Sequence, residues 1–377
     1  MTSPSGQVFT SYQDANITGR VYQYKYVSET GYKGYKVGWA SDLLGLPLRD
    51  VSVGDIDNDS GPEVVAIGFV TRKSKGKILG YDQRIFIFRP GSQGAPDSST
   101  LAVPCATAPH GAIIADADND GSNEYIVARG NAVEVYGWSQ DTAGEPLAFR
   151  NSGGSVVGAL HREWTSVDLG SKVWGLDVGD ADNNGQNELV LARFQIGSAQ
   201  IFKFQTGQGW TSQVTQSLGA VNIDIARVRD VDGDLSNEII AGGTIGKVAI
   251  WKYQDGAYQK VFLGPDLGGY NEFVDAADID GDGNVEIFSG GNFSTGLYVF
   301  GVNDPPQDYY DSLTLKYYLP FTGSCLGLEA IYHPALSPIA GIASGFNGFS
   351  IYVVSGEELL RTFNSYYARD LDVFHSP

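Results

Sequence analysis

Residues 278–286 of the chain read Asp-Ile-Asp-Gly-Asp-Gly-Asn-Val-Glu, and short apolar runs precede and follow this stretch. Carboxylates stand at its first, third, fifth and ninth positions, and a glycine stands where the chain must turn sharply. Oxygen ligands at this spacing are what a hard divalent cation such as calcium requires. Without a cation, four like charges on nine residues would repel one another. The stretch therefore predicts a cation-binding loop between two short β-strands.

The same pattern occurs four more times, at a period of roughly 50 residues with insertions in the early copies. A period in that range is typical of an array of small sheets. The five loops, residues 55–63, 116–124, 180–188, 230–238 and 278–286, are called loops 1 to 5. Their predicted metal ligands are Asp55, Asp57, Asp59, Glu63; Asp116, Asp118, Asp120, Glu124; Asp180, Asp182, Asn184, Glu188; Asp230, Asp232, Asp234, Glu238; and Asp278, Asp280, Asp282, Glu286. We expect about five structural calcium ions, with loop 3 the weaker site because Asn184 lowers its ligand charge.

The segments around the loops carry a resemblance to a known repeat family. They read VGDIDNDSGPEVVAIG, IADADNDGSNEYIVARG, VGDADNNGQNELVLARF, VRDVDGDLSNEIIAGGT and AADIDGDGNVEIFSGG. Quoted as they stand, they resemble the FG-GAP or VCBS repeats of integrin-type β-propellers. The resemblance implies a strand, a calcium loop and a second strand in each blade, and it places the loops on the face opposite the usual ligand site. It covers most of the chain but says little about activity.

We predict a single all-β domain over residues 1–377, a seven-bladed β-propeller with calcium loops in five blades. Segments show period-two alternation or β-rich apolar runs, and none shows a helical stripe of useful length. Six blades are expected at about residues 49–102, 109–170, 172–219, 221–264, 271–321 and 326–363. The seventh combines residues 368–377 with residues 6–40, because the start lacks an innermost strand and the far end supplies one. This pairing would close the ring and remove free sheet edges.

Two stretches interrupt the repeat. Residues 71–83, rich in Lys and Gly, are expected as an insertion in the first blade. Residues 140–160 are expected as a long loop in the second blade, before an outer strand at residues 163–169. Loops of that length are usually functional or disordered, so this one is a secondary candidate for function.

Composition limits the partners. The formal net charge of −19 disfavours nucleic acid and anionic membranes, although calcium would neutralise part of it. No apolar run approaches the length of a membrane-spanning helix, so no membrane insertion is expected. Cys105 and Cys325 are too few for a disulfide scaffold and are expected in separate blades. The start lacks a signal peptide's features, so the protein is extracellular or secreted if a signal was removed, and otherwise cytoplasmic. The oligomeric state stays open.

A second set of residues appears when the repeats are aligned on the first aspartate of each loop. Six residues earlier, at the predicted mouth of the central channel, stand Arg49, His110, Trp174, Asp224 and Glu272. These dissimilar side chains are typical of a single asymmetric ligand pocket, and the alternative is a solvated rim. Three residues before the aspartate, Arg227 falls between Asp177 and Asp275 of the adjacent repeats. We expect Arg227 to form a structural ion pair lining the channel.

Two functions remain open. The first is a binding protein that holds a carbohydrate or another small polar ligand at one site at the mouth, rather than a multivalent lectin. The second is an enzyme using the same site. By analogy with propeller polysaccharide lyases, His110 would be the base, Arg49 would neutralise a uronate carboxylate and Tyr270 would supply a second acid. A cyclase is a further alternative, and His161 is the second acid–base candidate.

Overall fold

Almost the whole described chain is extended. The structure is a computed structural model that describes residues 7–13, 19–30, 32–89, 94–104, 111–143, 147–194, 196–219, 221–244, 246–278, 282–291, 296–302, 309–320, 325–331, 339–344, 348–355, 358–364 and 370–374. Strand β1 and the strands beyond residue 320 are described by their backbone. The one helix in these ranges is a single turn, α1 (Tyr309–Ser312), so the all-β prediction is confirmed.

The strands alternate or carry apolar runs as the sequence predicts. In chain order they are β1 (Gln7–Gln13), β2 (Gly19–Glu29), β3 (Tyr32–Ala40), β4 (Leu48–Gly54), β5 (Glu63–Ser74), β6 (Lys77–Phe88), β7 (Asp97–Pro104), β8 (Ala112–Ala115), β9 (Glu124–Arg129), β10 (Ala132–Ser139), β11 (Leu147–Arg150), β12 (Val156–Thr165), β13 (Val173–Gly179), β14 (Glu188–Arg193), β15 (Gln200–Gln205), β16 (Gly209–Val214), β17 (Ile225–Arg229), β18 (Glu238–Gly242), β19 (Ala249–Gln254), β20 (Ala257–Leu263), β21 (Phe273–Ala277), β22 (Glu286–Gly290), β23 (Gly296–Gly301), β24 (Thr314–Pro320), β25 (Cys325–Ile331), β26 (Ile339–Ser344), β27 (Gly348–Ser355), β28 (Glu358–Asn364) and β29 (Asp370–Phe374).

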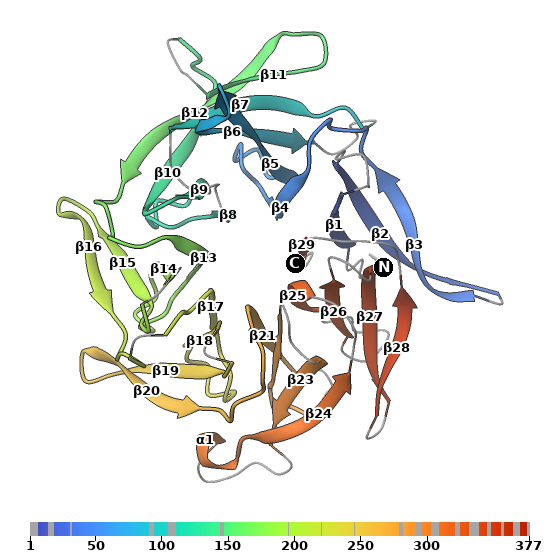
Figure 1. The fold of residues 1–377 in the computed structure, drawn as a ribbon, viewed down its shortest axis with the longest axis vertical. Coiled ribbons are helices and arrows are strands. Elements are labelled where there is room, and N and C mark those ends of the chain that lie inside the picture. Colours follow the sequence, from blue (N-terminus) through green and yellow to red (C-terminus); the bar gives the residue numbers. More distant parts are fainter. Residues whose placement is uncertain are drawn as a thin grey trace.

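The strands form small antiparallel sheets around a common centre (Figure 1). Five sheets have four strands, in the orders β29-β1-β2-β3, β13-β14-β15-β16, β17-β18-β19-β20, β21-β22-β23-β24 and β25-β26-β27-β28. A nine-stranded sheet runs β4-β5-β6-β7-β11-β12-β10-β9-β8, and its two parts meet where β7 pairs with β11 through Ser98 and Arg150. Each part brings one end strand, β4 or β8, toward the centre.

The two ends of the chain share a sheet. Strand β29 pairs antiparallel with β1, from Gln7 opposite Phe374 to Ser11 opposite Asp370. The pairing predicted between residues 369–374 and the first 30 residues is therefore confirmed. Because β29 also contacts β4 and β25, the strands next to the centre contact one another in cyclic order, β29, β4, β8, β13, β17, β21, β25.

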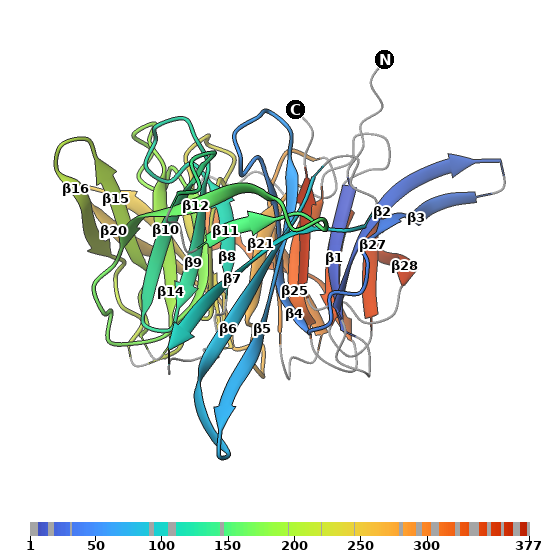
Figure 2. The same ribbon diagram turned by 90° about the horizontal axis from the view of Figure 1, so that it is seen from above.

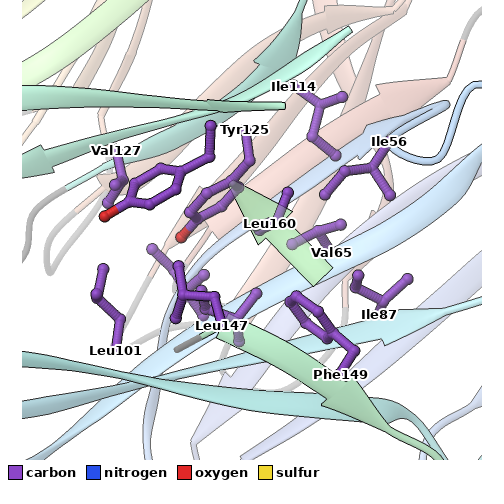
Figure 3. Close-up of a cluster of buried hydrophobic side chains, with 13 residues drawn as sticks. Ile56, Val65, Ile87, Leu101, Ile114, Tyr125, Val127, Leu147, Phe149 and Leu160 are labelled. Atoms are coloured by element: carbon purple, nitrogen blue, oxygen red, sulfur yellow. The ribbon is translucent and has the colours of Figure 1, made fainter. Parts of the chain in front are cut away.

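The core consists of apolar side chains between neighbouring sheets. One buried cluster joins Ile56, Val65 and Ile87 on one side to Tyr125 and Phe149 on the other (Figure 3). Similar clusters lie between β14 and β18 and between β18 and β22. Alternation along each strand places apolar side chains on both faces of the interior sheets, so each sheet packs against two neighbours.

Both interrupting stretches form strands. Residues 71–83 lie in the hairpin of β5 and β6, which extends well beyond the other strands (Figure 2). Residues 140–160 are not one long loop, since β11 and the first half of β12 lie within them and pair with each other. Leu147 and Phe149 are buried in the core cluster, and this burial is what holds the stretch in a sheet.

Candidate functional site

Each acidic loop joins an inner strand to the next strand of its sheet and is closed by its first aspartate. In loop 1, the backbone N–H groups of Asp59 and Ser60 donate to the two carboxylate oxygens of Asp55, at 3.0 and 2.8 Å. Asp180 accepts the equivalent pair in loop 3, at 2.9 and 2.8 Å. The turn needs a left-handed residue at its fourth position, and Asn58, with φ of 56°, supplies it.

The last carboxylate of every loop is buried. Glu63, Glu124, Glu188, Glu238 and Glu286 are at most 2 % exposed. In loops 1 to 4, Oε2 of this glutamate accepts a hydrogen bond from the backbone N–H seven residues earlier, at 2.8 to 3.2 Å. Burial raises the pKa of Glu124 to about 8 and the pKa values of Glu63, Glu188 and Glu238 to about 7. A bound cation would offset this unfavourable burial of charge.

Four loops bring carboxylate oxygens close enough to share a metal ion. The groups whose ligand atoms lie within 4.8 Å of one another are Asp116, Asp118, Asp120, Glu124; Asp55, Asp57, Glu63; Asp180, Asp182, Glu188; and Asp230, Asp232, Asp234. These loops can therefore hold a metal ion. The predicted ligands Asp59 and Glu238 are not members of these carboxylate groups. Asp280 lies outside the described residues, so the predicted loop 5 set with Asp278, Asp282 and Glu286 is not described in full.

Buried carboxylate oxygens without a hydrogen-bond donor also fit a bound cation. Oδ1 of Asp57, Asp116 and Asp182 is buried and accepts no hydrogen bond. The side chains of Asp57 and Asp182 are only 7 % and 5 % exposed. A buried acceptor without a donor is unfavourable by about 1 to 3 kcal/mol, and a divalent cation would satisfy it.

Neighbouring loops are bonded to one another through asparagines. Asn58 accepts a bond from the backbone N–H of Asn123 at 2.7 Å and donates to its carbonyl at 3.4 Å, while Nδ2 of Asn123 donates to the carbonyl of Asp55 at 2.9 Å. Asn119 and Asn187 repeat this arrangement between loops 2 and 3. The pair Asn183 and Asn237 repeats it between loops 3 and 4. Loops 1 to 4 therefore form a hydrogen-bonded chain along one face.

An arginine close to the predicted one bridges the two aspartates of the adjacent repeats. Arg229 bridges the two aspartates, with Nη1 3.1 Å from Oδ2 of Asp177 and Nε 2.9 Å from Oδ1 of Asp275. Nη1 of Arg227 donates to the carbonyl of Leu176 at 3.2 Å. The prediction took the alignment position of the two aspartates, and the structure shows that the arginine two residues later on β17 contacts both of them.

The residues predicted at the mouth lie at the other end of the inner strands from the acidic loops. Arg49 and Trp174 are the second residues of β4 and β13, and Asp224 and Glu272 directly precede β17 and β21. Neighbouring inner strands run side by side in the same direction. A Cβ on Gly175 would lie 2.7 Å from the carbonyl oxygen of Asp224, and one on Gly179 would lie 3.0 Å from Val228. His110 lies outside the described residues.

Three of these mouth residues interact electrostatically. Asp224 is 4 % exposed, and its Oδ2 accepts the N–H of Thr244 at 3.0 Å while Oδ1 is buried without a hydrogen-bond partner. Burial raises the pKa of Asp224 to about 6. Burial and the charge of Asp224 raise the pKa of Glu272 to about 7, against the opposing effect of Arg49. Two carboxyl groups that titrate near neutrality and one guanidinium can bind a polar ligand or exchange a proton with it.

The remaining candidates are distributed differently. Trp174 stacks on Phe194 with ring centroids 5.0 Å apart and planes at 19°, so this aromatic face is already packed. Tyr270 is 42 % exposed. His161 lies on β12, outside the central strands, where Nε2 is 2.8 Å from the carbonyl oxygen of Asp141. His161 therefore belongs to a different part of the nine-stranded sheet from Arg49.

One carboxylate near loop 2 was missed by the alignment of repeats. Glu163, near the end of β12, is exposed on the surface, but partial desolvation, followed by the charges of Asp118 and Asp120, still raises its pKa. The signal that could have identified it is Gly137, because loops 1, 3 and 4 have the long side chains of Arg89, Lys203 and Lys252 at the equivalent position. A Cβ on Gly137 would lie 2.1 Å from Oε1 of Glu163.

Within the described ranges, no helix is long and apolar enough to cross a membrane.

Comparison with known proteins shows the fold alone. No protein-family model matches the chain, and no curated protein matches it significantly. Among solved structures, a protein of Bacteroides uniformis, provisionally assigned as a 6-phosphogluconolactonase, superposes with a TM-score of 0.61 at 15 % identity, over 99 % of this chain and 100 % of that one. A humanized Polycomb Repressive Complex 2 of Chaetomium thermophilum bound to an inhibitor matches with a TM-score of 0.51 at 12 % identity, over 81 % of this chain and 67 % of that one. At these identities, the chain shares its fold with proteins of unrelated description.

Proposed function

We propose that this chain is a calcium-stabilised, seven-bladed β-propeller of the FG-GAP or VCBS type that binds one carbohydrate or another small polar ligand at the mouth of its central channel. The cyclic contacts of the inner strands support the seven-bladed architecture, with the nine-stranded sheet counted as two blades joined at their outer edges. Loops 1 to 4, with their buried and unpaired carboxylate oxygens, support the metal. In this proposal the metal has a structural role, because repeated sites of similar build favour a scaffold over a single reaction centre.

The observation that carries the ligand site is the buried carboxyl of Asp224. Its Oδ1 has no hydrogen-bond partner although Asp224, directly before β17, is only 4 % exposed and its other oxygen, Oδ2, already accepts the N–H of Thr244. A hydroxyl or amine group of a ligand would satisfy this acceptor. Glu272 lies within electrostatic range of both Asp224 and Arg49. One ligand could therefore donate hydrogen bonds to the carboxylates and accept one from the guanidinium of Arg49.

A screen of glycans and polysaccharides tests this proposal, with retention as the readout for binding. Asp224→Asn and Arg49→Ala are expected to reduce retention roughly 10-fold or more, since each removes one polar contact of about 1.5 to 3 kcal/mol. Asp255→Asn, in the exposed turn after β19, removes a charge away from the mouth and serves as the control. Equal retention by all variants would contradict a site at the mouth.

Catalysis at the same site is the second candidate, and the pKa of about 7 for Glu272 favours it. A group of that pKa accepts and donates protons efficiently at neutral pH. In the lyase version His110 is the base, Arg49 neutralises a uronate and Tyr270 is a second acid. The screen therefore includes polyuronates, read by absorbance of unsaturated products, and sugar lactones, because a structurally similar protein is described as a lactonase. Turnover that is lost in Glu272→Gln would favour an enzyme.

A further inference from the structure

In four of the acidic loops, the protein places a basic side chain of its own among the carboxylates. Lys203 on β15 is paired in register with Glu188, and its Nζ contacts Asp182. In loop 4, Nζ of Lys252 on β19 lies 2.9 Å from Asp232, 2.7 Å from Asp234 and 2.9 Å from Glu238.

A basic side chain also lies among the carboxylates of loops 1 and 5. In loop 1, Nη2 of Arg89 lies 2.9 Å from Oδ2 of Asp57. In loop 5, Gly301 stands opposite the buried glutamate, and Lys316 of the adjoining strand β24 reaches over it to lie 3.0 Å from Oε1 of Glu286. A Cβ on Gly301 would lie 3.0 Å from Cδ of Lys316, so the glycine provides the room that this lysine occupies.

Loop 2 is built the opposite way. Tyr136 pairs with Tyr125, so the next residue, Gly137, stands opposite Glu124. This is the position that Lys203 and Lys252 occupy in loops 3 and 4. The space above Gly137 holds the carboxylate of Glu163, which a Cβ would approach to 2.1 Å. In the described part of the chain, no lysine or arginine forms an ion pair with the carboxylates of loop 2.

A β-bulge directs Glu163 toward this loop. Val135 pairs with Trp164 and Tyr136 with Arg162, so Glu163 is the extra residue of β12 at the register shift. Bulges change the direction in which a side chain points, and this one accompanies the glycine that makes room. Asp116 of the same loop has a buried Oδ1 without a hydrogen-bond partner. The four carboxylates of loop 2 lie close enough to share an ion, and the carboxylate of Glu163 lies within electrostatic range of Asp118, Asp120 and Glu124.

We propose that loop 2 is the tight divalent-cation site of this protein and that Glu163 belongs to it, as a ligand or through a bound water. The basic side chains make loops 1, 3, 4 and 5 weak sites, because they neutralise the carboxylates and occupy the space of the metal. Calcium affinity rises with the charge of the ligand set, and loop 2 carries five carboxylates where loop 4 carries four and an ammonium. This inference rests on the proposed calcium binding and is independent of the proposed ligand at the mouth.

Isothermal titration of calcium into the full, metal-free chain tests the proposal. The wild-type protein is expected to show one tight step followed by weak binding. Glu163→Gln is expected to weaken the tight step roughly 10- to 100-fold, the usual effect of losing a ligand or its support. Lys252→Gln is expected to leave that step unchanged and to tighten the binding of a second ion, since it frees loop 4. Asp255→Asn controls for the loss of one negative charge.

The outcomes separate this inference from the proposed function. Several equal sites that Glu163→Gln does not change would overturn the role of loop 2 while leaving calcium binding intact. No heat of binding in the wild-type protein would overturn calcium binding itself, and this proposal with it. Far-ultraviolet circular dichroism of each metal-free variant verifies that the sheets are formed, so a lost step reports the site rather than unfolding.

Discussion

At the scale of single residues, the buried Asp224 and the half-buried Glu272 should couple folding to pH. The pKa of Glu272 is raised to about 7 and that of Asp224 to about 6, both above the values of exposed carboxyl groups. The native state therefore binds more protons than the unfolded chain between about pH 4 and pH 7. Stability from these groups is fully present below about pH 4 and is lost as the pH rises through the native pKa values.

Glu272→Gln should remove this loss. The variant is expected to be more stable than the wild type by about 1 to 2 kcal/mol at pH 8 and nearly equal to it at pH 4.5, because glutamine carries no charge in either state. Urea unfolding of both proteins at the two pH values, in calcium to hold the acidic loops constant, measures the difference. An equal effect at both pH values would contradict a raised pKa for Glu272.

Arg229 offers a second test at this scale. Asp177 and Asp275 are 5 % and 1 % exposed, and Arg229→Ala removes the guanidinium that pairs with both of these buried carboxylates. The free energy of unfolding should fall by about 3 to 5 kcal/mol. Arg227→Ala is the matched comparison from the same strand and should cost less. Denaturant titration of the two variants ranks them, and the reverse order would restore Arg227 as the bridging residue.

At the scale of elements, asparagine side chains connect loops 1 to 4 by hydrogen bonds. Between loops 4 and 5, both asparagine positions hold other residues. Gly233 replaces the asparagine in loop 4, and Val285 replaces its partner in loop 5. The link between two loops thus depends on a pair of residues more than 50 positions apart, on two different sheets. The links from loop 2 to loop 3 and from loop 3 to loop 4 tie one sheet to the next and so oppose separation of those sheets on this face.

Asn187→Ala should weaken the link between loops 2 and 3. The change removes the 2.7 Å bond from Nδ2 to the carbonyl of Asp116 and leaves the two backbone contacts with Asn119 in place. The expected loss is about 0.5 to 1.5 kcal/mol in the free energy of unfolding. Asn151→Ala, in the turn between β11 and β12, removes two hydrogen bonds to backbone N–H groups and serves as a positive control outside the loops. No measurable loss in Asn187→Ala, beside a clear loss in Asn151→Ala, would indicate that the link contributes no stability.

At the scale of the whole molecule, calcium should stabilise the closed array. Binding to the folded state alone raises stability by mass action, so excess chelator should lower the melting temperature by several degrees, and calcium should restore it. The formal charge of −19 adds general repulsion that the ions reduce. Magnesium, which demands a smaller and more regular site, should restore less. A melting temperature unchanged by chelator, measured by differential scanning calorimetry, would count against structural calcium.

The prediction of elements from sequence was most accurate where the pattern is local. Alternation and the nine-residue loops located the inner hairpins, and the spare strand at residues 370–374 was correctly paired with β1. The stretch 140–160 was misread as a loop because β11 has only four residues, too few to show periodicity. Its strand character comes from burial of Leu147 and Phe149 against other strands, which no local pattern records.

The sequence by itself determined the repeat, the acidic loops and the positions of Arg49, Asp224 and Glu272, because each depends on residues within one short segment. Only the tertiary structure decided which charged side chains enter each loop. Lys252 reaches loop 4 through the register of β18 and β19, and Glu163 is directed to loop 2 by a bulge in β12. Arg229 rather than Arg227 meets the two aspartates for a similar reason. These contacts join residues that are distant in sequence, and strand register and packing between sheets bring them together.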